Sequence, residues 1–531
     1  MLYSPWRRMA HERQTSGDGT RVPPVSTASP RLRRAGSPRA GRPRVADRAS
    51  RWGALIHLVG AAIALTGAAM IPTAAVALLY GERRVAVVFL LGASITLLAG
   101  LVCWRRYEAS QGLSVVRAFG AVGIAWFAMT AFGSLPFMMT GEIPRLPDAV
   151  FESASGFTAT GSSVVVDVAS LSHGVLFWRS LTQWIGGMGV VVLAVALLPL
   201  LGVGATQLAR AEAPGPTPER LTPRFQNTAK RLWIIYTGLT VAQIILLQFG
   251  DMSLFESVTH TFATISGGGF GTRPESMGAF SAYSQWVVIL FMVAGGTSFA
   301  LHNRAMRNPL EYVRDAEFRL YTFTLAAFSV AAAVGVWGGP FEETVRNASF
   351  SVVSILTTTG FATTDFGSWR PALQLMILGL MFVGAMAGST SGSLKVFRIE
   401  ALWNAGAARL RNHLHPAGVF VVRSAGQVLG EETIRSIRVL GTLYLFCFMT
   451  GTVLLGFIVS GAGSGLSVVS IASAVAASLG NIGPGLDMLG PTHTFAEVPD
   501  LGKGLLSLLM IVGRLEILPV LLLLTREFWR R

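Results

Sequence analysis

The chain has 531 residues, of which 51% are hydrophobic and only 13% are charged, and its net charge is +15. Soluble domains carry about 25% charged residues, so this composition excludes an ordinary soluble protein and indicates one that crosses the lipid bilayer many times. The basic excess is more typical of cytoplasmic loops than of a nucleic-acid-binding surface, and no nucleic-acid partner is expected. Cys103 and Cys447 predict neither a disulfide framework nor a metal cluster.

The N-terminal part of the chain divides into two zones. Residues 1–50 are rich in Arg, Pro, Ser and Gly, which predicts a disordered basic arm. Three alternatives are left open for this arm. It contacts anionic lipid, it is a disordered tail without a role, or the predicted start of the chain lies too far upstream. Two apolar segments follow, at about 53–80 and 86–103, and predict an added transmembrane hairpin within residues 51–112.

A fourfold pattern occupies the rest of the chain: a long apolar span, a short half-span, a glycine turn and a second span. Half-spans of about 10 to 14 residues are too short to cross the hydrocarbon core and are typical of re-entrant segments. Since irregular backbone survives at membrane depth only around a cavity or inside protein, four re-entrant turns predict one central pore. We expect about ten full spans in all. The predicted pore repeats are residues 113–205, 225–305, 315–400 and 430–531, with half-spans near 147–157, 253–265, 344–356 and 467–479.

The four glycine turns are the predicted ion filter. A cation that enters a membrane must exchange its water for oxygen ligands, and an extended backbone supplies carbonyl oxygens. Glycine permits positive φ and close approach of backbones, while Thr and Ser add hydroxyl oxygens without bulk. The predicted filter residues are Thr158, Ala159, Thr160, Gly161, Ser266, Gly267, Gly268, Gly269, Thr357, Thr358, Thr359, Gly360, Gly480, Asn481, Ile482 and Gly483.

Two further features recur at matched positions around the turn glycines. A small residue before each turn is expected to let the half-helices pack closely; these residues are Ser155, Ala263, Ser354 and Ala477. A carboxylate follows each turn, and it is either simply solvated or concentrates cations at the outer mouth. The carboxylates are Asp167, Glu275, Asp365 and Asp487.

The distribution of Lys and Arg predicts the orientation in the membrane. The positive-inside bias places both termini in the cytoplasm, so that all four glycine turns enter from outside. Arg83 and Arg84 are an exception in an outside segment. The basic segments expected inside are 104–112, 202–228, 302–317, 393–433 and the C-terminus.

A glycine- and serine-rich run, Gly384–Lys395, lies within the second span of the third repeat. Such a run is a poor helix interior, so it predicts either a broken helix that acts as a gate or a packing seam of small residues. The predicted gate residues are Gly388, Ser389, Thr390, Ser391, Gly392 and Arg514. Arg514 lies within the last span, where a charge is costly; it either shapes cation occupancy below the filter or pairs with Glu516 or backbone carbonyls.

Several motifs carry a resemblance to a known family. They are Thr158–Gly161, Trp184–Gly189, Gly268–Phe270, Thr357–Asp365, Gly388–Gly392 followed by Lys395–Arg398, Asn481–Gly485 and Gly513–Glu516. With these motifs the chain resembles the Trk/Ktr/HKT superfamily of potassium transporters, and within it the TrkH/TrkG membrane subunits, from about residue 53 to residue 531.

The resemblance implies an all-α polytopic membrane protein with four helix–pore-loop–helix repeats around a pseudo-fourfold pore plus an N-terminal hairpin. It implies uptake of K⁺, as the transported ion, across the cytoplasmic (inner) membrane of a prokaryote. It also implies a homodimer and a cytosolic TrkA-like regulatory subunit that binds NAD or another nucleotide. No nucleotide site is visible in this chain, and no cofactor of its own is expected.

The resemblance also bears on ion selectivity. In plant HKT proteins a Ser at the first filter glycine is associated with Na⁺ transport, and all four glycines are present here. The second turn departs from its relatives, because Gly267, Gly268 and Gly271 stand where Ser or Thr is frequent. A less selective K⁺/Na⁺ transporter of the same fold is therefore the alternative.

Two other classes of function fit the sequence poorly. A membrane-embedded enzyme would need convergent reactive side chains, and the histidines offer neither a nucleophile nor metal-ligand spacing; they are His260, His302, His413 and His415. A carrier of organic solutes built from inverted repeats conflicts with four turns that all enter from one side.

Overall fold

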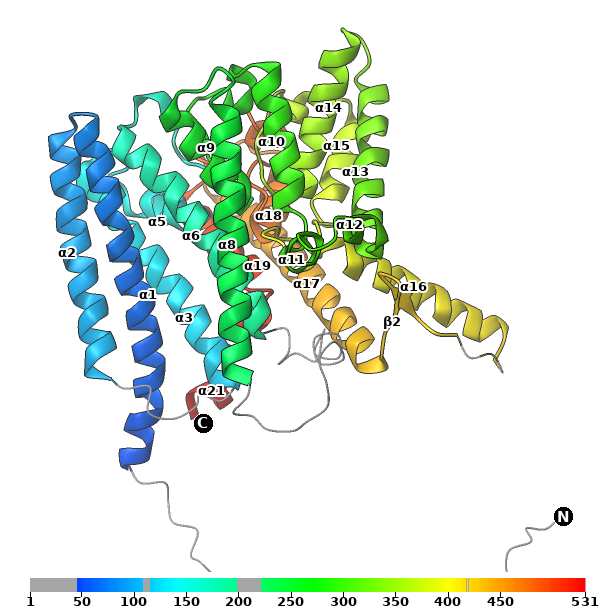
Figure 1. The fold of residues 1–531 in the computed structure, drawn as a ribbon, viewed down its shortest axis with the longest axis horizontal. Coiled ribbons are helices and arrows are strands. Elements are labelled where there is room, and N and C mark those ends of the chain that lie inside the picture. Colours follow the sequence, from blue (N-terminus) through cyan, green and yellow to red (C-terminus); the bar gives the residue numbers. More distant parts are fainter. Residues whose placement is uncertain (1–44, 108–114, 198–220, 417, 419, 531) are drawn as a thin grey trace, which may run out of the picture. The chain divides into compact units, whose positions relative to one another are not determined.

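The computed structural model describes residues 45–107, 115–197, 221–416, 418 and 420–530. Nearly all of the predicted arm, and parts of the expected loops 104–112 and 202–228, lie outside the described residues. Residues Ala49–Arg531 form one compact unit, separate from Met1–Arg48. Helices dominate the compact unit (Figure 1), which confirms the predicted all-α class.

Helices α1 (Val45–Leu79) and α2 (Arg83–Arg106) form the expected N-terminal hairpin. Glycines let the two backbones touch: a Cβ placed on Gly60 would lie 2.6 Å from the backbone nitrogen of Trp104. Close approach through small residues is the usual basis of helix association in lipid, where apolar surface gains little from leaving the solvent. The hairpin meets the remaining helices partly through the contact of α2 with α6 (His173–Leu197).

The remaining helices repeat one arrangement four times: a long first helix, a short helix, an irregular loop and a second helix. The first helices are α3 (Val115–Gly133), α8 (Leu221–Leu247), α13 (Ala316–Gly335) and α17 (Glu431–Gly461). The short helices are α5 (Leu146–Phe157), α9 (Leu254–Ser266), α14 (Phe341–Leu356) and α18 (Val468–Gly480), within a few residues of the expected half-spans. The second helices are α6, α10 (Ala282–Gly295), α15 (Pro371–Leu380) and α19 (Asp500–Arg514).

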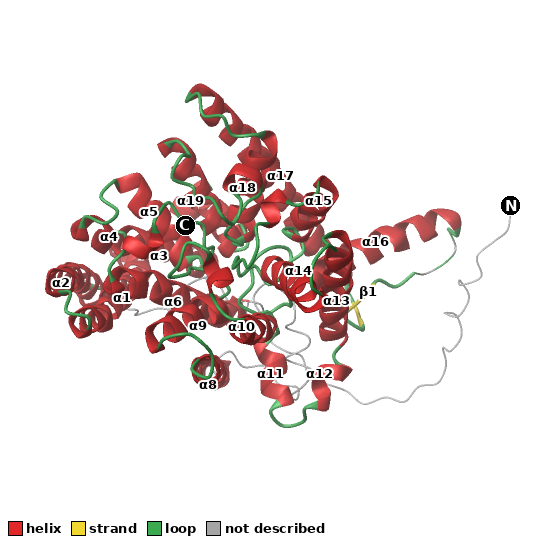
Figure 2. Ribbon diagram, turned by 90° about the horizontal axis from the view of Figure 1, so that it is seen from above, coloured by secondary structure: helices red, strands yellow, loops and turns green. Residues whose placement is uncertain are grey.

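The second helices join the four units into a ring. Helix α6 packs against α5 of its own unit and α9 of the next, α10 packs against α9 and α14, and α19 packs against α18 and α5. Helix α15 is shorter, and the segment after it reaches α18 instead, where Ser393 Oγ donates to the carbonyl of Gly480 at 3.3 Å. The α19–α5 contact closes the ring, and Figure 2 shows the loops gathered at its centre.

Among the described residues, fewer uninterrupted helices are long and apolar enough to span a membrane than the ten spans expected. Six helices of the described residues are long and apolar enough to span a membrane, or seven if α10 and α11 (Phe299–Ala305), bent by 98°, count as one. Helices are broken outside the third repeat as well, in the second and the fourth. Helix α10 ends at the Gly295–Gly296 pair, and α19 ends at Arg514, before positive φ at Glu516 and Ile517. Left-handed residues cannot continue a right-handed helix.

Short elements complete the unit. One β-hairpin, β1 (Arg423–Ser424) with β2 (Gln427–Val428), is the exception to the all-α class among the described residues. Helix α16 (Val396–Leu414) extends away from the other helices in both ribbon views (Figures 1 and 2). The other short elements are α4 (Leu135–Thr140), η1 (Val168–Ser170), η3 (Ser276–Ala279), α12 (Leu310–Arg314), η4 (Phe366–Ser368), η5 (Asp487–Leu489), α20 (Leu518–Leu523) and α21 (Arg526–Arg530).

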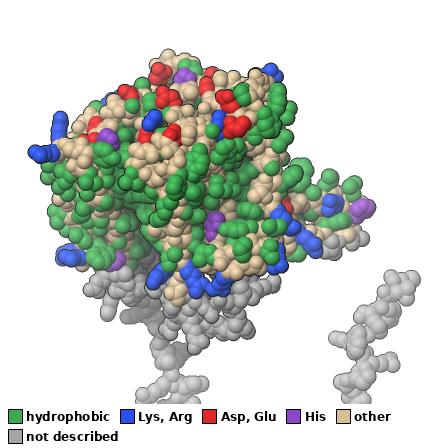
Figure 3. All heavy atoms as spheres, turned by 45° about the horizontal axis from the view of Figure 1, so that its top comes forward, with side chains coloured by type: hydrophobic (Ala, Val, Ile, Leu, Met, Phe, Trp, Pro, Cys, Tyr) green, Lys and Arg blue, Asp and Glu red, His purple; other side chains and the backbone are tan. Residues whose placement is uncertain are grey.

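Charged side chains gather at the two ends of the helices. In the face that Figure 3 shows, acidic side chains lie at the upper end, basic side chains lie mainly along the lower end, and hydrophobic side chains fill the band between. A hydrophobic band between charged ends is what a bilayer requires, since a charge within the hydrocarbon region is costly.

The contacts of Gly60 predict the effect of filling the hairpin interface. Gly60→Leu should lower the free energy of unfolding by about 1 to 3 kcal/mol, because the added side chain forces the two backbones apart. Thermal unfolding of the detergent-solubilised protein, followed by size-exclusion chromatography, measures the change. Gly238→Leu on α8 is the matched control, since no atom lies within 4 Å of a Cβ placed there. Equal melting temperatures for the two variants would contradict the packing described.

Candidate ion filter

All four short helices end in the same backbone motif. In each loop the residue before the turn glycine donates its N–H to a carbonyl five residues back, which caps the helix by the 6→1 bond of a Schellman motif. The pairs are Thr160 to Ser155, Gly268 to Ala263, Thr359 to Ser354 and Ile482 to Ala477, all at 2.8 Å. The small residues expected to aid packing therefore also supply the capping carbonyls.

Each motif requires a left-handed residue, and the turn glycine adds a second one two residues later. The first left-handed residues are Ala159, Gly267, Thr358 and Asn481, with φ of +50°, +71°, +58° and +54°. The turn glycines Gly161, Gly269, Gly360 and Gly483 have φ of +90°, +71°, +84° and +109°. An L side chain is strained in this region. Three of the first positions nevertheless carry one, at Ala159, Thr358 and Asn481, whereas every second position is glycine.

The four loops touch one another in a closed ring. A Cβ on Gly161 would overlap the carbonyl oxygen of Gly268, one on Gly269 that of Thr359, and one on Gly360 that of Ile482. A Cβ on Gly483 would lie 2.9 Å from the carbonyl oxygen of Thr160, which returns the series to the first loop. Every turn glycine thus lies against the residue before the turn glycine of the next loop.

The carbonyls of the ring are mostly free to bind a cation. No donor of the described residues bonds the carbonyl oxygens of Thr160, Thr359 or Ile482, whereas that of Gly268 accepts from Gln183 Nε2 at 2.6 Å. An unbonded backbone carbonyl inside protein normally has a water or ion as partner. The sixteen predicted filter residues are buried except Gly161, Gly269 and Gly360, which are partly exposed.

Side chains fix the loops to one another. Asn481 Nδ2 donates to Thr160 Oγ1 at 3.0 Å, and Ser162 Oγ donates to the carbonyl of Gly483 at 2.7 Å, so the first and fourth loops are joined twice. The threonine hydroxyls expected as extra ligands serve the loop frame: Thr158 Oγ1 donates to the carbonyl of Ala154 at 2.6 Å. Thr357 does the same with Val353 at 2.7 Å.

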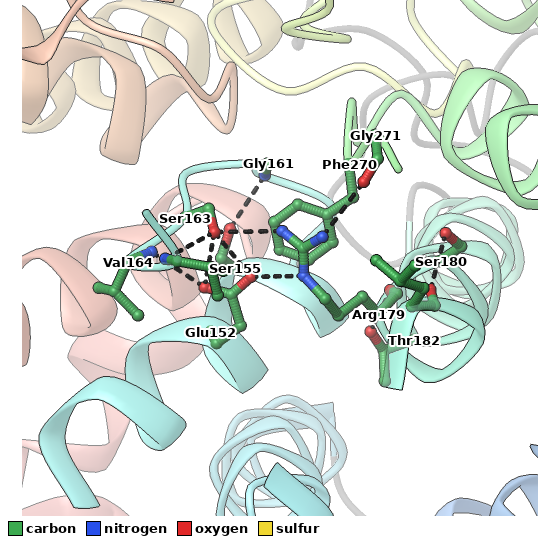
Figure 4. A network of polar contacts seen from close by, with 12 residues as sticks. Glu152, Ser155, Gly161, Ser163, Val164, Arg179, Ser180, Thr182, Phe270 and Gly271 are labelled. Atoms are coloured by element: carbon green, nitrogen blue, oxygen red, sulfur yellow. Dashed lines mark hydrogen bonds and ion pairs between the residues drawn. The ribbon is translucent and has the colours of Figure 1, made fainter. Parts of the chain in front are cut away.

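A buried ion pair supports the first and second loops (Figure 4). Glu152 of α5 and Arg179 of α6 are 0% and 2% exposed, and Arg179 Nε lies 2.7 Å from Glu152 Oε1. Glu152 also accepts from Ser163 Oγ at 3.0 Å, while Arg179 Nη1 donates to the carbonyl of Gly271 at 3.2 Å. The guanidinium of Arg179 lies 4.1 Å from the ring centre of Phe270. The pair therefore holds residues that follow the turn glycines Gly161 and Gly269 by one to three positions.

The four outer carboxylates differ in their local contacts. Asp167 and Asp365 accept the backbone N–H of Ala169 and Gly367, and so cap short 3₁₀ turns. Asp487 accepts from the hydroxyls of Ser467 and Ser470, which hold the pKa of this carboxyl below its usual value. Glu275 is exposed. For three of the four, a local structural role accounts for the carboxylate.

The segment Gly388–Gly392 lies directly beneath the loops. Thr390 Oγ1 donates to the carbonyl of Ile265 at 3.1 Å, and the N–H of Gly392 donates to Thr358 Oγ1 at 2.8 Å. Ser389, Thr390 and Ser391 are at most 2% exposed. The helix breaks earlier than expected, since α15 ends at Leu380 and left-handed backbone follows at Gly384, Gly388, Ser393 and Lys395.

Arg514 connects this segment to the first unit. Its Nη1 donates to the carbonyl of Thr390 at 2.7 Å and its Nη2 to that of Gly186 at 3.3 Å, and the residue is 4% exposed. The expected pairing with Glu516 is wrong, because Glu516 Oε2 accepts from Arg398 Nη2 at 2.8 Å. Pairing with backbone carbonyls, the other expectation for Arg514, agrees with the structure.

The comparison with known proteins identifies the family. A family model named TrkH and described as "Cation transport protein" matches residues 86–530. The chain belongs to the TrkH family of cation transporters. A family of transporters agrees with the expectation that the chain is not an enzyme.

TrkH relatives match nearly the whole chain. The "Trk system potassium uptake protein TrkH" of Vibrio parahaemolyticus is 37% identical over 492 residues, covering 90% of this chain and 99% of the relative. The protein of the same name from Escherichia coli strain K12 is 35% identical over 490 residues, with the same two coverages. The crystal structure of the potassium transporter TrkH from Vibrio parahaemolyticus matches with a TM-score of 0.81 and 34% identity, covering 90% of this chain and 100% of that one.

Sequence reasoning missed several residues that support the loops. Glu152 and Arg179 could have been recognised in the sequence, because a charged residue inside an apolar segment needs a partner. Lys503 gave the same signal; it is 1% exposed and its Nζ lies 2.6 Å from Asp148 Oδ1. Gln183 gave none, since a single amide in an apolar helix is common and its partners lie far along the chain.

The ion pair behind the first loop predicts a large stability change. Arg179→Met should lower the free energy of unfolding by about 3 to 5 kcal/mol, because it leaves the Glu152 charge buried without its partner. Thermal unfolding in detergent measures this, and adding Glu152→Gln to the same variant should recover part of the loss.

The matched control is Arg145→Met, whose partner Asp500 lies in an exposed pair, with side chains 58% and 49% exposed. This control should lose at most about 1 kcal/mol. A loss for Arg179→Met as small as that of the control would mean that the buried pair does not stabilise the loops.

Proposed function

We propose that this chain takes up K⁺ across the cytoplasmic membrane of a prokaryote through a filter made of the four glycine loops. The observation that carries the proposal is the closed ring of loops, in which the carbonyls of Thr160, Thr359 and Ile482 have no donor among the described residues. Carbonyl oxygens that replace the hydration shell are the ligands of potassium filters. The relatives named as potassium uptake proteins support K⁺ as the ion.

The filter residues of this proposal are those predicted from the sequence, in the turns that end at Gly161, Gly269, Gly360 and Gly483. The short helices before them support cation binding, because each helix ends at the ring and the C-terminal end of a helix carries partial negative charge. K⁺ is favoured over Na⁺ by the presence of all four turn glycines, and a less selective K⁺/Na⁺ transporter of the same fold remains the alternative.

The proposed gate is the segment Gly388–Gly392 with Arg514. The segment lies under the ring and is held by hydrogen bonds to the second and third loops and to Arg514. Ion passage requires this segment to move aside. The left-handed backbone at Gly388, and the absence of helical hydrogen bonding in the segment itself, favour such a movement because little regular structure has to be broken.

The proposed setting follows from charge and from the family resemblance. Basic side chains gather mainly at one end of the face in Figure 3, and by the positive-inside bias this end faces the cytoplasm, with both termini. Two copies of the chain form a homodimer. A cytosolic TrkA-like subunit that binds NAD or another nucleotide regulates the gate, since no nucleotide site was predicted in this chain.

Rubidium flux into proteoliposomes tests the proposal. We expect uptake of Rb⁺, as a K⁺ analogue, that excess external K⁺ suppresses strongly and excess Na⁺ weakly. Flux with and without a pH gradient separates channel-like from proton-coupled transport. Equal competition by Na⁺ and K⁺ would favour the less selective alternative, and the absence of any Rb⁺ flux from well-folded protein would refute the proposal.

Gly161→Ser should reduce the preference for K⁺ over Na⁺. The new Cβ overlaps the carbonyl oxygen of Gly268 and must displace it. Overpacking costs about 1 to 3 kcal/mol. Where this strain weakens the binding of K⁺ more than that of Na⁺, the ratio of K⁺ uptake to Na⁺ uptake falls by up to about a hundredfold. Competition of Na⁺ against Rb⁺ uptake measures the ratio. Gly379→Ser, where a Cβ meets nothing within 4 Å, is the control and should keep the native ratio.

Arg514→Met should increase ion flux in the absence of a regulatory subunit. The variant loses the hydrogen bonds to the carbonyls of Thr390 and Gly186, so the segment beneath the filter loses one of its supports. Loss of hydrogen bonds to a charged donor corresponds to about 1.5 to 3 kcal/mol, or roughly tenfold to a hundredfold in the open population. Rb⁺ flux into proteoliposomes measures this, and unchanged or lower flux from correctly folded protein would argue against the gate.

A further inference from the structure

One side chain outside the four loops bonds directly to the ring of carbonyls. Gln183, on α6 of the first unit, is fully buried. Its Nε2 donates to the carbonyl of Gly268 at 2.6 Å, and its Oε1 accepts the N–H of Phe270 at 3.1 Å. The amide therefore holds the second loop on both sides of its turn glycine, Gly269. Among the described residues, no other side chain bonds a carbonyl at this position of the ring.

The other three units have methionine at the equivalent place. In each unit one glycine near the second helix serves as the reference: Gly186, Gly295, Gly384 and Gly513. The residue three positions before it is Gln183 in the first unit and Met292, Met381 and Met510 in the second, third and fourth. Three of these glycines make the same contact, with the carbonyl of the residue four positions before a turn glycine. The pairs are Gly186 with Phe157, Gly295 with Ile265 and Gly513 with Leu479. This shared contact aligns the first, second and fourth units with one another, and Met381 of the third unit is aligned by its spacing from Gly384 in the sequence. A methionine offers no N–H donor.

The loop that faces Gln183 also differs from the others. At the position before the turn glycine, the first and third loops have Thr160 and Thr359, the fourth has Ile482, and the second has Gly268 without a side chain. The three atoms nearest to a Cβ placed on Gly268 all belong to the amide of Gln183, with Cδ at 2.4 Å, Oε1 at 2.6 Å and Nε2 at 2.8 Å. The glutamine amide occupies the space that a threonine side chain fills elsewhere.

We propose that Gln183 is a specificity-determining residue of the ion filter. Its amide compensates for the missing side chain of Gly268 and holds the carbonyl of Gly268, in the second loop, within the ring. This inference rests on the filter proposed above. Three consecutive glycines, Gly267–Gly269, give the second loop more backbone freedom than a loop with threonines has. Where cavity size sets selectivity, discrimination between K⁺ and the smaller Na⁺ requires that the carbonyls do not collapse onto the smaller ion; where the ligand field sets it, the number of carbonyls held at the ion matters.

The amide acts in two ways. Its two hydrogen bonds to the backbone of one loop restrict rotation of the peptide groups on either side of Gly269. Its N–H also takes one lone pair of the Gly268 carbonyl, which leaves the other for the ion. Gln183 thus positions a ligand without itself being one, and the second quadrant keeps the geometry that side-chain packing gives the other three.

The proposal is tested by variants that give the second loop and its neighbouring helix the residue types of the third loop, with methionine in place of Gln183 and threonine in place of Gly268. Gln183→Met removes both hydrogen bonds of the amide while keeping a side chain of similar length. It should lower the Rb⁺ over Na⁺ uptake ratio by about tenfold, the scale of losing the bond to the Gly268 carbonyl. Adding Gly268→Thr to Gln183→Met should restore the native ratio to within about threefold. Gly268 lacks positive φ, so threonine is allowed there.

Gln285→Met is the matched control for the loss of a buried glutamine. Gln285 of α10 donates Nε2 to the carbonyls of Met277 and Phe280, away from the ring, at 3.0 and 2.9 Å. This variant should lose stability in a thermal unfolding assay and keep the native uptake ratio. If it lowers the ratio as far as Gln183→Met does, the effect of Gln183 is a general loss of structure and the proposal is overturned.

The outcomes separate this inference from the filter assignment. If the Rb⁺ over Na⁺ uptake ratio is native in Gln183→Met but reduced in Gly161→Ser, the proposed role of Gln183 is overturned. The assignment of the four loops as the filter is then retained. Native ratios in both variants overturn the filter. If Gln183→Met fails to reach the membrane, the double variant decides: recovered insertion with a native ratio supports the proposal, and a reduced ratio or absent protein overturns it.

Discussion

Backbone contact between neighbouring loops is the constraint on which the rest of the structure depends. Each turn glycine lies against a carbonyl of the next loop, so the four loops can form a ring only where no Cβ intervenes. The short helices bring the loops together, the Schellman caps turn the backbone away from each helix axis, and the second helices hold neighbouring units in register. Polar side chains such as Glu152 and Arg179 then support the loops from behind.

The parts of this arrangement that could be read from the sequence are the local ones. The length of an apolar run and a following glycine are sufficient to place α5 or α18 within a few residues, because both signals lie within one short window. The break after α19 could not be predicted in the same way, since Gly513 is an ordinary residue in a transmembrane helix and the left-handed Glu516 and Ile517 depend on tertiary contacts. The partner of Arg514 was left open between Glu516 and backbone carbonyls for the same reason: Glu516 is near in sequence, but the carbonyl of Thr390 is near in space.

The four quadrants share a backbone and differ in what supports it. The fourth loop reaches the first through Asn481, the third is tied from below through Thr358, and the second depends on Gln183 of the preceding unit. Mutations in different quadrants should therefore have different consequences even at equivalent positions, and symmetry of the backbone is a poor guide to symmetry of function. The contrast between Gly268 and Thr359 shows this on the scale of a single side chain.

Because all four quadrants belong to one polypeptide, any residue of the ring occurs once per pore. In a channel assembled from four identical subunits, a substitution is copied four times; four arginines around one axis would repel one another and block cations together. Arg514 occupies a position that is Gly187 in the first unit and Gly296 in the second, so the ring of units carries a single buried guanidinium there. A chain that holds all four units can therefore change one position of the ring without changing the other three.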